Sequence, residues 1–246
     1  MPTSWSDRAL QIRSGELTKA CSVPGCRLPT YRMSSTCEPH RQALRTKGST
    51  TAGRVTIREL RPNVIVAMAF IVEQEAKAHP AILAALDYLE RLTKTAAELE
   101  RDSPRQGQRP RPGARVDSLL ARFRRDSVDL RLVLATGIAC ELHRLSDPRR
   151  WPDHRHASHQ FAAAVACLAR GRSRGVRTEG ASRPAIRSPS TGFLRELARQ
   201  LRDPLTPLYI RAATSIHDRA ERLANPVPRA ALDQPFTSDS HRTTSI

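Results

Sequence analysis

Apolar residues recur at steps of three and four through most of the chain beyond residue 53, and this spacing places them on one face of an α-helix. The pattern is clearest from residue 80 to residue 101, where leucine, isoleucine and alanine occupy one face and charged side chains the other. Alanine and leucine dominate the apolar positions and aromatic residues are scarce, which favours helices over sheets. The sequence therefore predicts a mainly α fold.

Local signals refine this pattern at three places. Thr56 followed by Glu59 forms a capping box, which predicts a helix start; Pro62 then either interrupts that helix or lies in the first turn of a second one. Residues 64–72 are apolar on every side, so we expect them to be buried at the centre of a helical bundle. The apolar register slips near Ser127, which indicates two helices there rather than one.

Three more helices are expected towards the C-terminus. The first is rich in alanine, and the last carries Pro204 in its first turn. Their ranges are 159–170, 191–202 and 204–223.

The chain carries a formal net charge of +17, and only four of its 41 basic residues are lysines. Charge of this size indicates polyanionic partners, with nucleic acid first and an anionic membrane surface second. Arginine favours phosphate and guanine recognition because its planar guanidinium makes two parallel hydrogen bonds. Of the two nucleic acids, DNA is preferred over RNA as the expected partner. A GC-rich genome is the alternative explanation for the arginine excess.

The expected compartment is the cytoplasm. The longest apolar run, residues 64–72, is nine residues, whereas a transmembrane helix needs roughly 20. Residues 1–20 also lack the apolar core of a signal peptide, and free thiols persist inside the cell.

Four residues in a twenty-residue stretch have the spacing of metal ligands: Cys21, Cys26, Cys37 and His40. A Pro-Gly pair between the first two cysteines predicts a turn that brings both sulfurs to one side. The second pair shares one face if a helix begins near Cys37 and runs to a stop at Gly48. The spacing therefore predicts a closed, structural Zn²⁺ site; the alternative is three buried cysteines and a surface histidine.

This segment resembles the small zinc modules of phage and mobile-element DNA-binding proteins and of HNH-type nucleases. The resemblance covers about 30 residues and implies association with nucleic acid, without carrying over an activity, because no His-Asn-His constellation is recognisable downstream. The matching residues are Cys21, Cys26, Pro29, Tyr31, Cys37, His40, Arg41, Arg45, Lys47 and Gly48.

The small metal core forces the remaining side chains of the module outward, so its basic and aromatic residues are the candidate nucleic-acid contacts. Their alternative role is the solvated face of a finger that binds protein. The candidates are Arg27, Tyr31, Arg32, Arg41, Arg45 and Lys47.

These signals divide the chain into five parts. Two stretches are rich in arginine, glycine and proline: residues 102–115 have the composition of a disordered linker, whereas residues 171–190 form a long loop that is either functional or disordered. The predicted parts are a zinc-binding module with a basic helix (1–53), a helical region (54–101), a disordered basic linker (102–115), a C-terminal helical region (116–224) and a disordered tail (225–246).

Other cysteines and histidines are interpreted as structural. Cys140 and Cys167 lie in apolar runs, so core packing is favoured over a second metal site with His143 and the histidines at 154, 156 and 159. Tyr209 is flanked by apolar residues and is expected to pack rather than to act as a recombinase nucleophile.

No catalytic residue is assigned, and the chain is expected to bind nucleic acid, with the helices available for self-association or a protein partner. Two alternatives remain open. One is a nuclease or recombinase component, and the other is a scaffold whose finger binds protein.

Overall fold

The computed structural model is mainly helical, which confirms the predicted fold class. Among the described residues it contains eight α-helices and one short 3-10 helix, and the β-structure there is limited to a single bridge between Ala20 and Pro29. The described residues are 19–30, 34–102, 111–168 and 189–225.

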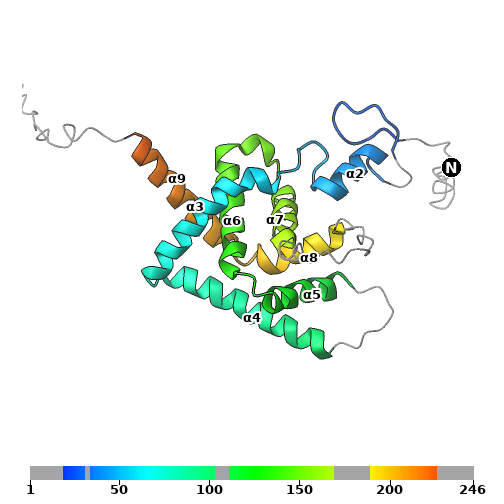
Figure 1. The fold of residues 1–246 in the computed structure, drawn as a ribbon. Coiled ribbons are helices and arrows are strands. Elements are labelled where there is room, and N and C mark those ends of the chain that lie inside the picture. Colours follow the sequence, from blue (N-terminus) through cyan, green and yellow to red (C-terminus); the bar gives the residue numbers. More distant parts are fainter. Residues whose placement is uncertain (1–18, 31–33, 103–110, 169–188, 226–246) are drawn as a thin grey trace, which may run out of the picture.

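Figure 1 shows the arrangement of the helices. In chain order they are α2 (Glu38–Lys47), α3 (Ile57–Ala76), α4 (Pro80–Asp102), α5 (Pro112–Arg125), α6 (Leu130–Ser146), η1 (Pro148–Arg150), α7 (His154–Leu168), α8 (Thr191–Leu201) and α9 (Thr206–Ala224).

Helix α6 is the centre of the fold and packs against α3, α4, α7 and α9 (Figure 1). Every residue from Val133 to Leu142 is buried, as expected for a helix that is apolar almost all round. Gly137 permits the closest of these contacts, because a Cβ atom there would lie 2.4 Å from the ring of Tyr209 on α9. The Tyr209 hydroxyl donates a hydrogen bond to the carbonyl of Leu201, so this tyrosine packs as predicted.

The expectation that residues 64–72 form the buried centre is wrong. They lie in α3, where Ile65, Val66 and Val72 are 61%, 47% and 53% exposed. Helix α3 packs mainly against α6, with smaller contacts to α4 and α9, and among the described residues these three side chains have no element packed fully over them.

The start of α3 is as predicted. The Thr56 side chain accepts a hydrogen bond from the backbone N–H of Glu59, and the Glu59 carboxylate accepts one from the N–H of Thr56. The helix continues through Pro62, which faces solvent, so this proline neither interrupts α3 nor begins a second helix.

The helix boundaries near the predicted linker differ from the sequence prediction. Helix α5 begins at Pro112, so residues 112–115 are helical rather than disordered, because proline suits a first turn and Val116 is buried behind it. Residues 103–110 lie outside the described part, as do 171–188 of the second arginine-rich stretch and 226–246 of the predicted tail. One hydrophobic core extends from α3 to α9 across both predicted helical regions.

The remaining boundaries are close to prediction. The break near Ser127 is confirmed, and Ser127 itself has a positive φ of 49° between α5 and α6. Helix α7 begins at His154, five residues earlier than expected, because Asp153 accepts a hydrogen bond from the N–H of His156. The first-turn proline of α9 is Pro207 rather than Pro204. Within the described part, no helix combines the length and apolarity that a membrane span requires.

Candidate metal centre

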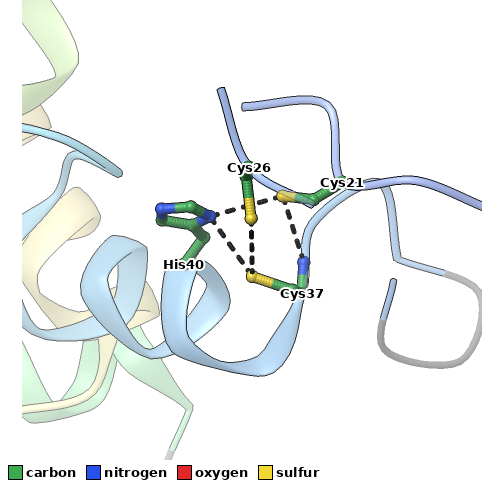
Figure 2. A group of neighbouring side chains, drawn as sticks. All are labelled: Cys21, Cys26, Cys37 and His40. Carbon is green, nitrogen blue, oxygen red and sulfur yellow. Dashed lines mark hydrogen bonds between the residues drawn. The ribbon is translucent and has the colours of Figure 1, made fainter. Parts of the chain in front are cut away.

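The first two cysteines lie on a tight hairpin. The N–H of Cys21 donates to the carbonyl of Leu28 at 3.2 Å, and the N–H of Cys26 donates to the carbonyl of Val23 at 3.1 Å. Gly25 closes this turn with a φ of +77°, a conformation that glycine adopts without strain. The hairpin directs both sulfurs to the same side (Figure 2).

The second pair of residues begins helix α2. Cys37 is the residue before the helix, and His40 follows one turn later on the same face (Figure 2). A hydrogen bond of 2.9 Å from the N–H of Ser22 to the carbonyl of Ser35 joins the hairpin to this segment. Local structure alone therefore brings the four predicted ligands together.

Four donor atoms converge in this cluster, all within 4.8 Å of one another. The sulfurs of Cys26 and Cys37 are 3.8 Å apart, and Nδ1 of His40 lies 3.3 Å from the sulfur of Cys21 and 3.2 Å from that of Cys37. A tetrahedral ion with metal–sulfur bonds of about 2.3 Å and a metal–nitrogen bond of about 2.0 Å needs edges of roughly 3.8 and 3.5 Å. The predicted ligand set is thus confirmed as a group that could hold a metal ion.

The electrostatics of the cluster also suit a cation. Burial opposes ionisation of Cys21, but hydrogen bonds from the N–H groups of Cys37 and Val23 and from His40 outweigh it and lower its pKa to about 6. Burial and the two neighbouring sulfurs raise the pKa of Cys37. Three thiolates could share so small a volume only with a positive charge between them, and a bound metal ion would supply that charge.

Helix α2 docks the module onto helix α7. The amide of Gln160 spans the junction: its Nε2 donates to the carbonyl of Lys47 at 2.6 Å, and its Oε1 accepts from the N–H of Val55 at 3.1 Å. His159 Nε2 donates to the carbonyl of Arg45 at 3.3 Å, and burial lowers the pKa of this histidine. These contacts could not be predicted from the sequence, because more than 100 residues separate Gln160 from its partners.

Gly48 ends α2 directly against His159, and this contact gives a test of docking. Its φ is +77°, and a Cβ atom would lie 2.5 Å from the Cβ of His159. We expect Gly48→Ala to push α2 away from α7 and to lower the free energy of unfolding by about 1–3 kcal/mol. The measurement is urea unfolding followed by circular dichroism.

The matched control is Gly25→Ala. Gly25 has the same φ of +77°, but no other atom lies within 4 Å of the position that a Cβ atom would take. Both substitutions strain the backbone, and only the one at Gly48 meets a neighbour. Equal losses in the two variants would mean that α2 does not rest closely on α7.

The candidate nucleic-acid contacts are only partly within the described residues. Arg27, Arg45 and Lys47 are exposed, whereas Arg41 is half-buried and forms an ion pair with Glu38. Tyr31 and Arg32 lie outside the described residues.

The alternative second metal site does not form within the described part of the chain. Cys140 is 2% exposed in the core, and burial raises its pKa to about 12. His143 accepts a hydrogen bond from the indole N–H of Trp151 at 3.0 Å, and His156 packs edge-on against the same indole. Among the described residues, the Cys21 cluster is the group that has metal-binding geometry.

The remaining histidine, His154, is hydrogen-bonded to the arginine of a buried ion pair. Arg202 donates to Glu141 at 2.8 Å from one nitrogen, and from the other to His154 Nε2 at 2.7 Å and to Ser158 Oγ at 3.2 Å. Arginine only donates hydrogen bonds, so Nε2 of His154 must be the acceptor and its proton is on Nδ1. Because Nδ1 of His154 already carries a proton, it cannot accept one from Ser158. Ser158 and His154 therefore do not have the geometry of a nucleophile and its general base.

Compared with known protein families, curated proteins and solved structures, the chain has no match, so the comparisons add no support for the resemblance to phage or HNH-type modules.

Proposed function

We propose that the cluster holds one zinc ion and that the chain binds nucleic acid, DNA in preference, through the basic surface of the metal module. Three thiolates and one imidazole are a ligand set that zinc favours, and they fill all four positions of a tetrahedral ion. The ion would hold the module together and leave no open position for chemistry.

The observation that carries the binding proposal is the exposed positive charge of the module. Among the described residues, Arg27, Arg45 and Lys47 have no ion-pair partner, whereas many other arginines of the chain are paired with acids. Arg45 and Lys47 lie on the last turn of α2. The helix is fixed near its start by the metal ligand His40 and at its end by the hydrogen bond from Gln160. Charges on a fixed helix can contact phosphates without the cost of ordering it.

The proposal is tested by fluorescence anisotropy with a duplex of about 20 base pairs at several salt concentrations. We expect Arg45→Ala/Lys47→Ala to weaken binding and to reduce the slope of log K against log salt by about two, because two phosphate contacts are lost. The matched control is Arg122→Ala/Arg124→Ala, which removes the same charge from an exposed face of α5.

Two results would overturn the proposal. Equal effects of the two double variants would show attraction by net charge without a site on the module. Affinity that does not change with salt would exclude phosphate binding and would favour a finger that binds protein.

A further inference from the structure

A pocket of about 470 Å³ opens where the metal module meets the helices. Leu44 of α2 and Gly48, which follows the helix, form one wall, and residues of α7, of α8 and just after α8 form the others. Because α2 supplies a wall, the pocket exists only while the module is docked. Its volume is in the range of small-ligand sites, roughly 300–1,000 Å³.

The walls combine an apolar surface with unneutralised positive charge. Leu44 and the methyl group of Ala198 supply the apolar part. Arg155 and Arg195 reach the pocket from α7 and α8, and within the described part of the chain neither has an ion-pair partner. Asp203 is the one acid among the lining residues.

Other groups around the pocket add to its preference for anions. Arg199 also lines it, but its Nε and Nη2 donate to the Glu196 carboxylate, and this ion pair neutralises much of its charge, so it contributes shape more than charge. Arg155 lies in the first turn of α7, and Thr191 is the first residue of α8. The N-termini of two helices therefore border the pocket; the Asp153 carboxylate already caps that of α7, so the positive dipole end of α8, capped by the neutral Ser190 hydroxyl, contributes more.

We propose that this pocket binds a nucleotide unit, with its phosphate on Arg155 and Arg195 and its base against Leu44 and Ala198. A phosphate matches the two guanidinium groups, which form charge-assisted hydrogen bonds with it. A flat base matches the apolar wall, and the Asp203 carboxylate can accept hydrogen bonds from an exocyclic amino group.

The nucleotide can come from an unpaired end of a bound strand or from free nucleotide. The first source rests on the proposed nucleic-acid binding, whereas the second does not. Duplex DNA keeps its bases stacked, so a strand that uses this pocket must offer an unpaired base.

The experiment measures binding of four probes to the full chain: adenosine monophosphate, inorganic phosphate, a single-stranded oligonucleotide and its blunt duplex. We expect Arg155→Ala/Arg195→Ala to weaken the single strand and the monophosphate by about tenfold or more, and to change duplex binding little. Leu44→Ser should weaken the monophosphate and leave inorganic phosphate unchanged, because it removes the apolar wall alone. Arg122→Ala/Arg124→Ala is the control for lost charge.

The outcomes separate this inference from the proposed function. In one outcome, only Arg45→Ala/Lys47→Ala loses duplex binding, and Arg155→Ala/Arg195→Ala behaves like the control for every probe. This result overturns nucleotide binding in the pocket and keeps the proposed function. Pocket-dependent binding of the monophosphate with no binding of either DNA overturns the proposed function and assigns the pocket to free nucleotide. If Arg155→Ala/Arg195→Ala weakens binding of the single strand but not binding of the monophosphate, the pocket is assigned to an unpaired strand.

Discussion

Replacing Cys37 with serine is expected to remove the metal from the chain and to unfold the module, while α3 to α9 stay folded. Cys37 is one of the four candidate ligands, precedes α2 and is 1% exposed in the small core that it forms with Cys21 and Val23. Metal-binding free energy in such modules is also folding free energy, about 10–16 kcal/mol for structural zinc peptides at pH 7. A module with so few apolar side chains cannot replace that contribution.

The later helices should survive because they have a core of their own. Among the described residues, the main hydrophobic core begins with Val55 and contains no residue of the module, and the main helix contact between the two parts is that of α2 with α7. Docking adds the hydrogen bonds of Gln160 and His159, whose loss costs roughly 1 kcal/mol each.

Elemental mass spectrometry of the purified protein measures this prediction directly. One zinc per chain in the unchanged protein and about none in Cys37→Ser is the expected result, with most of the helical circular dichroism retained. Cys167→Ser is the control, because Cys167 is a half-buried free cysteine outside the cluster. Retained metal, or a collapse of the whole helical signal, would contradict the prediction.

The cluster that could hold a metal ion could be predicted from the sequence because its arrangement is local. Four ligands lie within twenty residues, a Pro-Gly turn closes the first pair, and helical spacing aligns Cys37 with His40. No distant part of the chain has to be placed correctly for the four donor atoms to meet.

The docking of the module could not be predicted in the same way. Gln160 holds α2 through the backbone carbonyl of Lys47 and the backbone N–H of Val55, and backbone groups leave no trace in the residue pattern. The pocket beside α2 depends on this docking, so it could not be predicted from the sequence either.

The choice of the central helix also required the structure. Helices α3 and α6 are both apolar on several sides, and the pattern alone does not say which one the others surround. Gly137 was the available signal, since a glycine within an apolar helix often marks a close approach of another element. The ring of Tyr209 on α9 approaches Gly137 of α6 in this way, whereas Ile65 and Val72 of α3 remain exposed.

Replacing Glu141 with glutamine is expected to lower the free energy of unfolding by about 3–5 kcal/mol, the usual cost of breaking a buried ion pair. The side chains of Glu141 and Arg202 are 3% and 4% exposed, and their ion pair joins α6 to the end of α8. Without the carboxylate, the Arg202 guanidinium stays charged in the interior, because arginine does not lose its proton in proteins. Hydrogen bonds to His154 and Ser158 remain, but neither group carries a compensating negative charge.

The reverse change, Arg202→Met, should cost less, and this asymmetry makes the prediction specific. Glu141 keeps its 2.6 Å hydrogen bond to Arg144, and a buried carboxyl can also take up a proton. Glu196→Gln is the control, because it breaks the exposed pair with Arg199, which is worth about 1 kcal/mol or less. Urea unfolding of the three variants measures these losses in the free energy of unfolding. If Glu141→Gln lowers it no more than Glu196→Gln does, the buried pair does not hold α6, α7 and α8 together.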